Sequence, residues 1–218
     1  MNQASNTMRK YLKYLSYIFI AVSISSAFAS SYEDFFIAIT RNDGRAITAL
    51  VERGFDPNTR GPAGEIGLVS ALHSENLAAA EALFARPDIR LDLLNPAGES
   101  ALMMAALHGQ YDWCVRLLAR GAPINKPEWS PLHYAASGPD AKVVRLLLDR
   151  GAVVEAESPD RTTPLMMAAR YGTEDSVKLL LARGADPMRM NDRNMTAADF
   201  AQGSGREWLV ELLSKPAR

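Results

Sequence analysis

The three histidines of this 218-residue chain are spaced too widely to form a metal site on their own. They are His73, His108 and His133, which lie 35 and 25 residues apart, whereas structural zinc sites pair their ligands roughly two to five residues apart. We therefore expect no metal and no cofactor. We expect His133 to be a structural hydrogen-bonding residue that ties neighbouring segments together. We expect His73 and His108 to face a groove, where they contact a partner, act as weak pH-sensitive groups, or are solvated.

The single cysteine, Cys114, excludes an intramolecular disulfide. Its position corresponds to apolar residues elsewhere in the chain, namely Ile47, Val144 and Val177. Because free cysteine behaves as a small apolar residue when buried, we expect Cys114 to lie in the core. A reactive thiol would instead require exposure and a lowered pKa.

The nine methionines include the adjacent pairs Met103–Met104 and Met166–Met167, and Met188 and Met190 flank an arginine. Thioether groups bind Cu(I), so a soft-metal or oxidant sink is one hypothesis for their function. Packing inside helices is the stronger interpretation of the two adjacent pairs. Exposed methionines would also suit an adaptable protein-binding surface.

No catalytic motif is present. Ser204 lies between two glycines, but the Gly-x-Ser-x-Gly pattern of a nucleophile elbow is missing. A phosphate-binding glycine-rich loop that ends in Lys-Ser/Thr is also missing, and the acidic residues are scattered. We therefore expect the protein not to be an enzyme.

Residues 1–29 have the pattern of a secretory signal peptide. Arg9, Lys10 and Lys13 precede an apolar run without charges that ends in Ala27-Phe28-Ala29. We expect cleavage after Ala29 and a periplasmic or secreted protein with no membrane attachment. An uncleaved N-terminal anchor is the alternative. The whole chain has a net charge of −1, so nothing in its charge favours nucleic acid as a partner.

The rest of the chain is a repeat. The stretches at 100–122 and 163–185 are nearly the same, with Leu102 and Leu165 at equivalent places, and the spacing between successive equivalents is 33, 34, 30, 33 and 33 residues. The other equivalent residues are Phe35, Leu68, Leu132 and Ala198. This predicts one domain over 30–218 in six units, at about 30–59, 60–94, 95–125, 126–157, 158–190 and 191–218.

Each unit is expected to form two short helices that bury their apolar faces only by stacking on neighbouring units. A hydroxyl residue before the first helix can accept hydrogen bonds from free amides of the first turn, and a glycine in the left-handed region can end the second helix. The predicted caps are Ser100, Ser130, Thr163 and Thr196. The predicted end glycines are Gly54, Gly121, Gly151 and Gly184.

The stretches "SPLHYAAS" and "TPLMMAARYG", and the later "VKLLLARGADP", resemble the motifs of the ankyrin-repeat family. The resemblance implies an all-α solenoid of about six helix-turn-helix units with β-hairpin fingers, which binds a protein partner without catalysis. Together with the signal peptide, it indicates similarity to exported bacterial ankyrin-repeat proteins. That similarity suggests a monomer that supports a periplasmic oxidative-stress enzyme such as catalase, or an immunity protein that neutralises a toxin.

The chain departs from the family pattern in its fourth unit. The 30-residue spacing before Leu132 shortens one finger to "NKPEW" (residues 125–129). Pro139 stands where Gly109 and Gly172 stand in other units, and proline cannot adopt a positive φ. We therefore expect Gly138 to take the left-handed conformation at this turn.

The residues that contact a partner are expected to be those that the stack does not require. In the family these positions lie just before the hydroxyl cap and at the end of the first helix. Trp129 is the strongest candidate because the short finger does not itself require a large aromatic residue; its alternative role is to fill the space left by the missing residues. The full set of predicted contact residues is Trp129, Tyr171, Arg170, His108, His73, Glu99, Thr162 and Met195.

Overall fold

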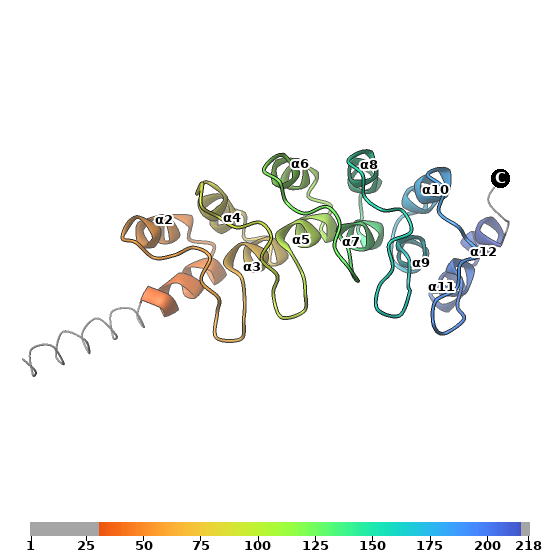
Figure 1. Ribbon diagram of the computed structural model, residues 1–218, viewed down its shortest axis with the longest axis horizontal. Helices are drawn as coiled ribbons and strands as arrows, with labels where there is room; N and C mark the ends of the chain where they lie inside the picture. Colours follow the sequence, from red (N-terminus) through yellow and green to blue (C-terminus); the bar gives the residue numbers. More distant parts are fainter. Residues whose placement is uncertain (1–30, 215–218) are drawn as a thin grey trace, which may run out of the picture.

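The computed structural model describes residues 31–214, which form a row of paired short helices (Figure 1). The predicted signal peptide, residues 1–29, lies outside the described residues. The helices are one over residues 31–40, then α2 (Gly44–Glu52), α3 (Gly67–His73), α4 (Leu77–Phe84), α5 (Ala101–Leu107), α6 (Tyr111–Ala119), α7 (Pro131–Ser137), α8 (Ala141–Asp149), α9 (Pro164–Arg170), α10 (Glu174–Ala182), α11 (Ala197–Gly203) and α12 (Glu207–Leu213).

The helix pairs stack side by side in two layers. The first helix of each pair, here called an inner helix, packs on the next inner helix along the row, so that α3, α5, α7, α9 and α11 follow one another. The second helices, here called outer helices, form the other layer (Figure 1). The loops that join consecutive pairs project beyond the inner layer as fingers, at residues 60–66, 94–99, 125–129, 157–162 and 190–195.

Four inner helices, α5, α7, α9 and α11, begin at the predicted hydroxyl residues, whereas α3 follows Ile66 and has no side-chain cap. The Ser100 hydroxyl accepts a hydrogen bond from the Met103 backbone N–H at 3.3 Å, and the Thr163 hydroxyl accepts one from Met166 at 3.4 Å. Thr196 does the same for the last inner helix. These bonds satisfy amides that have no partner inside the helix. The prediction for these three caps is confirmed.

In four units a side chain three residues after the cap returns a hydrogen bond to the backbone N–H of the cap residue. In α7 the acceptor is Nδ1 of His133, at 3.1 Å. In α5 and α9 it is the sulfur of Met103 or Met166, at 3.3 and 3.4 Å, and in α11 it is the Asp199 carboxylate at 2.7 Å. Methionine in α5 and α9 therefore does what histidine does in α7, which is to accept a hydrogen bond from the backbone N–H of the cap residue.

The outer helices end as predicted, at glycines in the left-handed region. The φ angles of Gly54, Gly121, Gly151 and Gly184 lie between 85° and 96°. The expectation for Gly138 is wrong, because its backbone is extended, with φ −79° and ψ 173°. A Cβ atom at this position would lie 2.8 Å from the Ala106 carbonyl oxygen. Glycine is required there because the preceding unit approaches closely.

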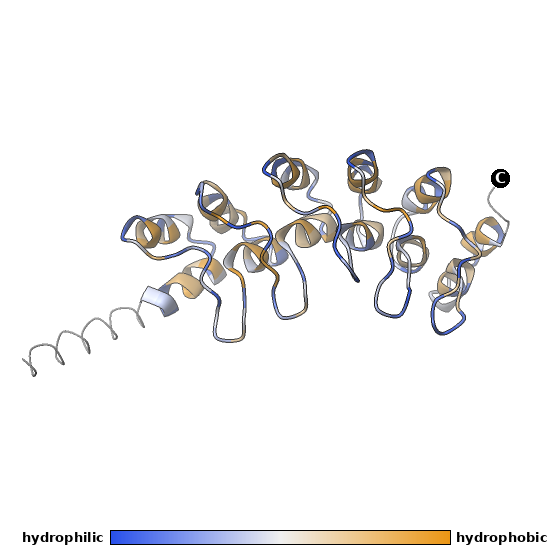
Figure 2. Ribbon diagram, viewed as in Figure 1, coloured by the Kyte–Doolittle hydropathy of each residue, from blue (hydrophilic) through white to orange (hydrophobic). Residues whose placement is uncertain are grey.

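The core lies between the two layers of helices. Hydrophobic residues are concentrated on the helices, whereas the fingers are mostly hydrophilic (Figure 2). The adjacent methionines pack as predicted, since Met103, Met104 and Met166 are buried. Cys114 is also fully buried, and burial raises the pKa of its thiol to about 12. It is therefore a core residue that stays protonated at neutral pH.

The fingers are hairpin turns rather than paired strands. In the finger at 157–162, the Ser158 N–H donates to the Thr162 carbonyl oxygen at 3.0 Å, and the same pattern links Asn95 to Glu99. Within residues 31–214 the only strand-like pairing is one bridge, between Arg60 and Ile66. The turns are too short for a hydrogen-bonded ladder to extend along them. In this same part of the chain, no helix combines the length and apolar character that a membrane span requires.

Candidate protein-binding surface

An apolar pocket of about 410 Å³ lies on the inner layer at the middle of the row. It is formed where the short finger meets α7, with side chains from α5 and α9 on either side. Its lining residues are Leu107, Trp129, His133, Tyr134, Ser137, Met167 and Tyr171. Larger hollows of about 730 and 610 Å³ lie along the outer helices, but charged side chains line them. An apolar lining with a few polar groups is typical of a binding pocket.

Trp129 forms one wall of the pocket. The short finger ends well before its neighbours (Figure 1), and the Lys126 ammonium group donates to the Trp129 carbonyl oxygen at 3.0 Å. The half-buried indole packs edge-on against the His133 ring, with centroids 5.2 Å apart. Trp129 thus fills part of the space left by the shorter finger and also presents a surface to the pocket.

His133 is fully buried and connects two units through both ring nitrogens. Its Nδ1 accepts from the Ser130 N–H, so the proton is on Nε2, which donates to the Thr162 carbonyl oxygen at 3.0 Å. Burial lowers the pKa of His133 to about 4. The ring is therefore neutral at pH 7, and the predicted structural role is confirmed.

Tyr134 lies next to the buried histidine and reaches back to the preceding finger. Its hydroxyl donates to one Glu99 carboxylate oxygen at 2.9 Å, while the Asn95 amide donates to the other at 2.7 Å. Burial, together with the Glu99 carboxylate, raises the pKa of Tyr134. Glu99 is thus held by side chains of the protein itself.

Tyr171 and Arg170 stand at the open side of the pocket, where α9 ends. The Tyr171 side chain lines the pocket and is 58% exposed. The Arg170 guanidinium lies 5.1 Å from the centre of the Tyr171 ring. No carboxylate pairs with Arg170 within residues 31–214.

His73 and His108 lie together near the ends of α3 and α5, but neither lines the pocket. Their rings are 6.0 Å apart. His73 Nδ1 lies 3.1 Å from the sulfur of Met104, and His108 Nδ1 lies 3.7 Å from a Glu75 carboxylate oxygen. In the described part of the chain, no three His, Cys, Asp or Glu side chains converge as metal ligands would.

Thr162 was wrongly expected to contact a partner. Its side chain is only 2% exposed. Its carbonyl oxygen accepts from His133, and the Asn191 amide lies 3.3 Å from its hydroxyl. The residue closes the turn of its own finger and so faces inward. Met195 is half-buried and packs against the core, so it offers only part of its side chain.

Tyr134, Met167 and Leu107 line the pocket but were not predicted. They lie on the inner helices beside residues that the stack buries. Tyr134 and Met167 lie about one turn before the ends of α7 and α9, and Leu107 is the last residue of α5. The repeat spacing does reveal these positions, because Tyr134 aligns with Met104 and Met167 when the anchor leucines are aligned. What the spacing does not reveal is that the short finger leaves these side chains open to solvent.

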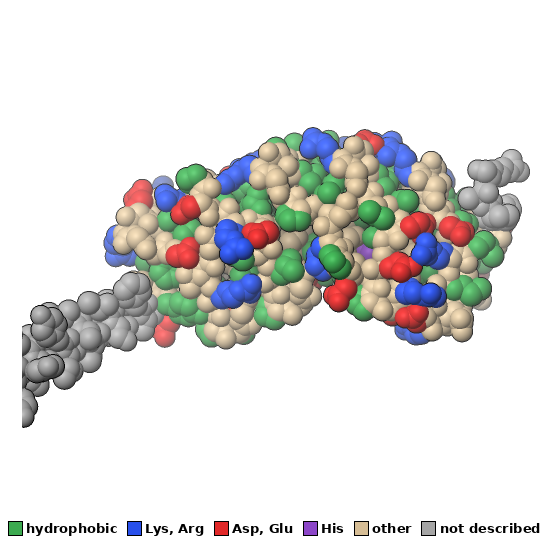
Figure 3. All heavy atoms as spheres, in the orientation of Figure 1, with side chains coloured by type: hydrophobic (Ala, Val, Ile, Leu, Met, Phe, Trp, Pro, Cys, Tyr) green, Lys and Arg blue, Asp and Glu red, His purple; other side chains and the backbone are tan. Residues whose placement is uncertain are grey.

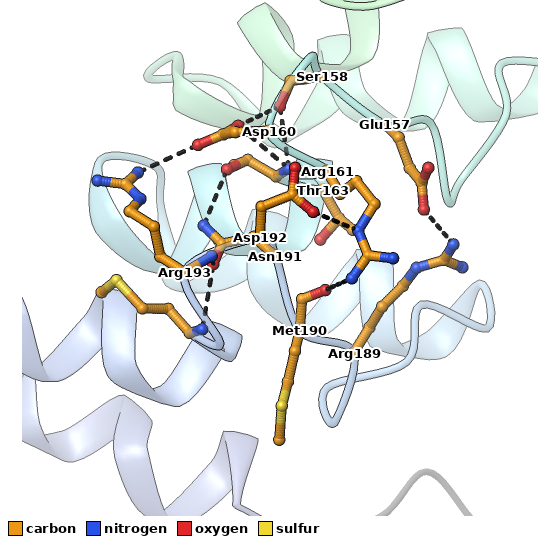
Figure 4. A network of polar contacts seen from close by, with 12 residues as sticks. Glu157, Ser158, Asp160, Arg161, Thr163, Arg189, Met190, Asn191, Asp192 and Arg193 are labelled. Carbon is orange, nitrogen blue, oxygen red and sulfur yellow. Dashed lines mark hydrogen bonds and ion pairs between the residues drawn. The ribbon is translucent and has the colours of Figure 1, made fainter.

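The last two fingers are joined by reciprocal ion pairs (Figure 4). Asp160 pairs with Arg193 at 3.2 Å, and Arg161 pairs with Asp192 at 2.9 Å. Arg189 also pairs with Glu157. The space-filling view shows charges of both signs gathered on this part of the surface (Figure 3). The network fixes these two fingers to each other and leaves few of their charges free for a partner.

Comparisons with known proteins agree on one family. The family model described as ankyrin repeats (3 copies) matches residues 35–128, 114–191 and 132–217. The chain is 42% identical over 93 residues to human neurogenic locus notch homolog protein 4, which covers 41% of this chain and 5% of that protein. It is 32% identical over 126 residues to the Drosophila melanogaster tyrosine-protein kinase Shark, which covers 56% of this chain and 13% of the kinase.

Among solved structures, the fold is similar to that of a chain in the complex of a predatory endopeptidase from Bdellovibrio bacteriovorus with an immunity protein. The TM-score is 0.70 at 25% identity, and the match covers 83% of this chain and 96% of that one. The curated relatives are far longer than the segments they share with this chain. The family model, by contrast, spans nearly all of the described residues. The chain therefore belongs to the ankyrin-repeat family.

Proposed function

We propose that this protein is a non-catalytic scaffold that holds one protein partner against its inner helices and fingers. Ankyrin repeats are in general a non-enzymatic protein-interaction module. The observation that carries the proposal is the central pocket. Trp129 and Tyr171, which do not recur at the equivalent positions of other units, come from different units and line the same pocket.

The proposal includes export to the periplasm or beyond, for which the support is the signal-like pattern of residues 1–29. It also includes a monomeric state. N-terminal sequencing of the exported protein should begin at Ser30. Recovery of the intact N-terminus in a membrane fraction would instead indicate an anchor. The proposed task of the scaffold is to support an oxidative-stress enzyme such as catalase, and a binding assay with the purified enzyme would test it.

The partner-binding face can be tested by photo-crosslinking. A photoreactive phenylalanine analogue replaces Tyr171 on the inner face in one variant and Lys178 on the outer helix α10 in the other. We expect a discrete protein adduct from position 171 and none from position 178, because both side chains are exposed but only the first lies beside the pocket. Equal adducts from both positions, or none from either, would contradict the proposed face.

A second candidate function is that of an immunity protein that binds and restrains a peptidase. It is favoured by the structural similarity to a chain in an endopeptidase–immunity protein complex, at 25% identity with 96% of that chain covered. The test is to add the purified protein to the exported peptidases of the same organism and follow hydrolysis of a casein substrate. Inhibition that Tyr171→Ala abolishes would support this function, and unchanged hydrolysis would exclude it for those peptidases.

The soft-metal or oxidant hypothesis receives less support from the structure. Met103 and Met166 are buried, and their sulfurs accept cap hydrogen bonds. Within residues 31–214, the exposed thioethers are those of Met188 and Met190, at 48% and 49% exposure. Copper titration followed by mass spectrometry, compared with Met188→Leu/Met190→Leu, would show whether this exposed pair binds metal.

A further inference from the structure

We propose that the central pocket takes one aromatic side chain of the protein partner, with an acidic group beside it that pairs with Arg170. This inference rests on the proposed scaffold function and specifies the chemistry of the partner. Three observations carry it: the lining of the pocket, its unused hydrogen-bonding groups, and the charges around it.

The lining suits a flat apolar group. Trp129, Tyr134 and Tyr171 supply aromatic surfaces, and Met167 supplies a thioether. Aromatic rings pack favourably in edge-on and offset arrangements, and sulfur makes favourable contacts with ring edges. The pocket already contains one such edge-on contact, between Trp129 and His133. A further aromatic ring would extend the same packing.

The pocket also has polar groups that the fold does not use. Within residues 31–214, the Trp129 indole N–H and the Tyr171 hydroxyl have no hydrogen-bond partner, whereas the Tyr134 hydroxyl is bound to Glu99. The backbone carbonyl groups of a partner segment could accept from both free donors. Tyrosine and tryptophan are enriched at interfaces because they combine an apolar ring with such a donor.

The charges favour an acidic group next to the ring. The inner helices α3, α5 and α7 carry no Asp, Glu, Lys or Arg, and α9 carries only Arg170. In α11 the Asp199 carboxylate is occupied by its cap residue, Thr196. Arg170 is therefore the one charged side chain on α3, α5, α7, α9 and α11 without an ion-pair or capping partner, and it lies against the pocket wall. A carboxylate of the partner would be attracted to it and a basic residue repelled.

A side chain on a larger partner fits this site better than a free small molecule does. Small-molecule sites usually enclose most of their ligand, whereas Tyr171 is 58% exposed and leaves one side of the pocket open. An aromatic side chain needs only its ring covered, because the rest of the partner covers the open side. The test below therefore includes a free aromatic acid, phenylacetate, for comparison.

The test uses short peptides and the indole N–H resonances of the ¹⁵N-labelled protein. The probe is Ac-Phe-Asp-NH₂, with Ac-Phe-Lys-NH₂, Ac-Ala-Asp-NH₂ and phenylacetate as comparisons. Trp113, which is buried, and Trp208, which is 62% exposed at the end of the row, are internal controls. We expect Ac-Phe-Asp-NH₂ to shift the Trp129 resonance alone. Its affinity should exceed that of the lysine peptide about threefold, as for an exposed ion pair, and that of the alanine peptide about tenfold.

Three variants assign the contacts. Tyr171→Ala should weaken Ac-Phe-Asp-NH₂ about tenfold, as loss of an aromatic hot spot does. Arg170→Gln should remove only the preference for aspartate over lysine. The control Arg145→Gln, on the exposed side of α8, should change neither. Unfolding curves of all three proteins establish that each is folded under the conditions of the titration.

Each contrary result overturns a stated part of the proposal. A Trp129 resonance that does not move excludes an aromatic occupant, whereas a crosslink from position 171 would still support the scaffold function. Equal binding of the lysine and aspartate peptides excludes the role of Arg170. Binding of phenylacetate as tight as that of Ac-Phe-Asp-NH₂ would identify the pocket as a small-molecule site instead of a peptide-recognition site.

Discussion

The position three residues after each cap shows how one side chain can perform two structural tasks. Met103, His133 and Met166 all accept the cap amide. Only His133 has a second polar atom, which donates to the Thr162 carbonyl oxygen in the next unit. The methionine units rely on apolar packing at the equivalent place. His133 therefore provides a polar link between units that also depends on pH.

Replacing His133 with Met should separate these two tasks. The substitution keeps an acceptor for Ser130 but leaves the Thr162 carbonyl oxygen without its partner, which should cost about 1–3 kcal/mol of unfolding free energy at pH 7.5. In the wild type, the folded-state pKa of about 4 lies below the ordinary 6.5. Unfolded chains therefore bind an extra proton below about pH 6.5, and stability falls as the pH drops toward 4, by roughly 3 kcal/mol in all.

Urea unfolding of both proteins between pH 7.5 and 4 provides the measurement. The His133→Met protein should be less stable at pH 7.5 and should show a flatter decline across this interval. Carboxyl groups with lowered pKa, such as Asp160 and Asp199, titrate in both proteins, so the difference between the two curves isolates the histidine. Parallel curves would show that His133 does not titrate in this range.

Trp129 has both roles that its sequence position allowed, since it packs on His133 and lines the open pocket. Trp129→Ala should remove about 2 kcal/mol of stability, roughly half the cost for a fully buried tryptophan. This corresponds to a melting temperature lower by about 4–8 °C in a protein of this size. Partner binding should also weaken about tenfold or more.

The matched control is Trp208→Ala, because Trp208 is 62% exposed at the end of the row and should change the melting temperature little. Differential scanning fluorimetry of the two variants gives the comparison. If Trp129→Ala leaves the melting temperature unchanged, the indole contributes contact surface only and does not pack the short finger.

At the scale of elements, the five inner helices α3 to α11 have seven residues each. Helices this short are not stable alone in water, so each depends on its caps and on close approach to its neighbours. Two glycines permit that approach. A Cβ atom at Gly172 would lie 2.0 Å from the Ala136 carbonyl oxygen, and one at Gly138 would lie 2.8 Å from that of Ala106.

Gly172 and Gly184 should respond differently to substitution, because they are glycines for different reasons. Gly184 has a φ of 89° and open space around it, so Gly184→Ala should cost about 1–2 kcal/mol of backbone strain. Gly184→Asn should recover most of this loss, since asparagine tolerates the left-handed region. At Gly172 both substitutions should cost about 3 kcal/mol or more, because the neighbouring backbone must move.

Chemical denaturation of these four variants tests the distinction. Rescue by asparagine at both positions would mean that the contact at Gly172 relaxes easily and that the units are not held at the close spacing seen here. Equal losses for both alanine variants would also contradict two separate causes.

The helices and their ends were more predictable from the sequence than the close packing between neighbouring units. Caps, apolar stripes and end glycines depend on local chemistry, so Ser100, Thr163 and Gly184 behave as expected. Gly138 does not, because its requirement comes from carbonyl groups of another unit. Thr162 was misplaced for a similar reason: its exposure depends on the finger that follows, where Asn191 reaches back to it.

At the scale of the whole molecule, the candidate binding surface lies at a single irregularity in a regular array. Six similar helix pairs produce a continuous inner layer, and the repeat period predicts that layer directly. The pocket lies where three residues are missing before α7, and Trp129 from the shortened finger lines it. The sequence revealed the deletion and both aromatic residues, Trp129 and Tyr171. The sequence alone did not show that both side chains line one pocket, because that depends on how closely α7 and α9 pack together.

The array also determines how stability is distributed, which truncations of two leucines should reveal. Leu147 in α8 and Leu213 in α12 are both fully buried. Their surroundings differ nevertheless, because α8 packs on α6, α7 and α10, whereas α12 packs mainly on α11. Leu147→Ala should cost about 2–5 kcal/mol, as buried leucine truncations do. Leu213→Ala should cost less in global unfolding, because the end unit can open without disturbing the others.

Urea titration monitored by circular dichroism measures the global loss, and hydrogen exchange in α11 and α12 measures local opening. Leu213→Ala should accelerate exchange in those two helices alone, while Leu147→Ala should accelerate it in several units. Equal global losses with uniform exchange would mean that the six helix pairs unfold as one cooperative body.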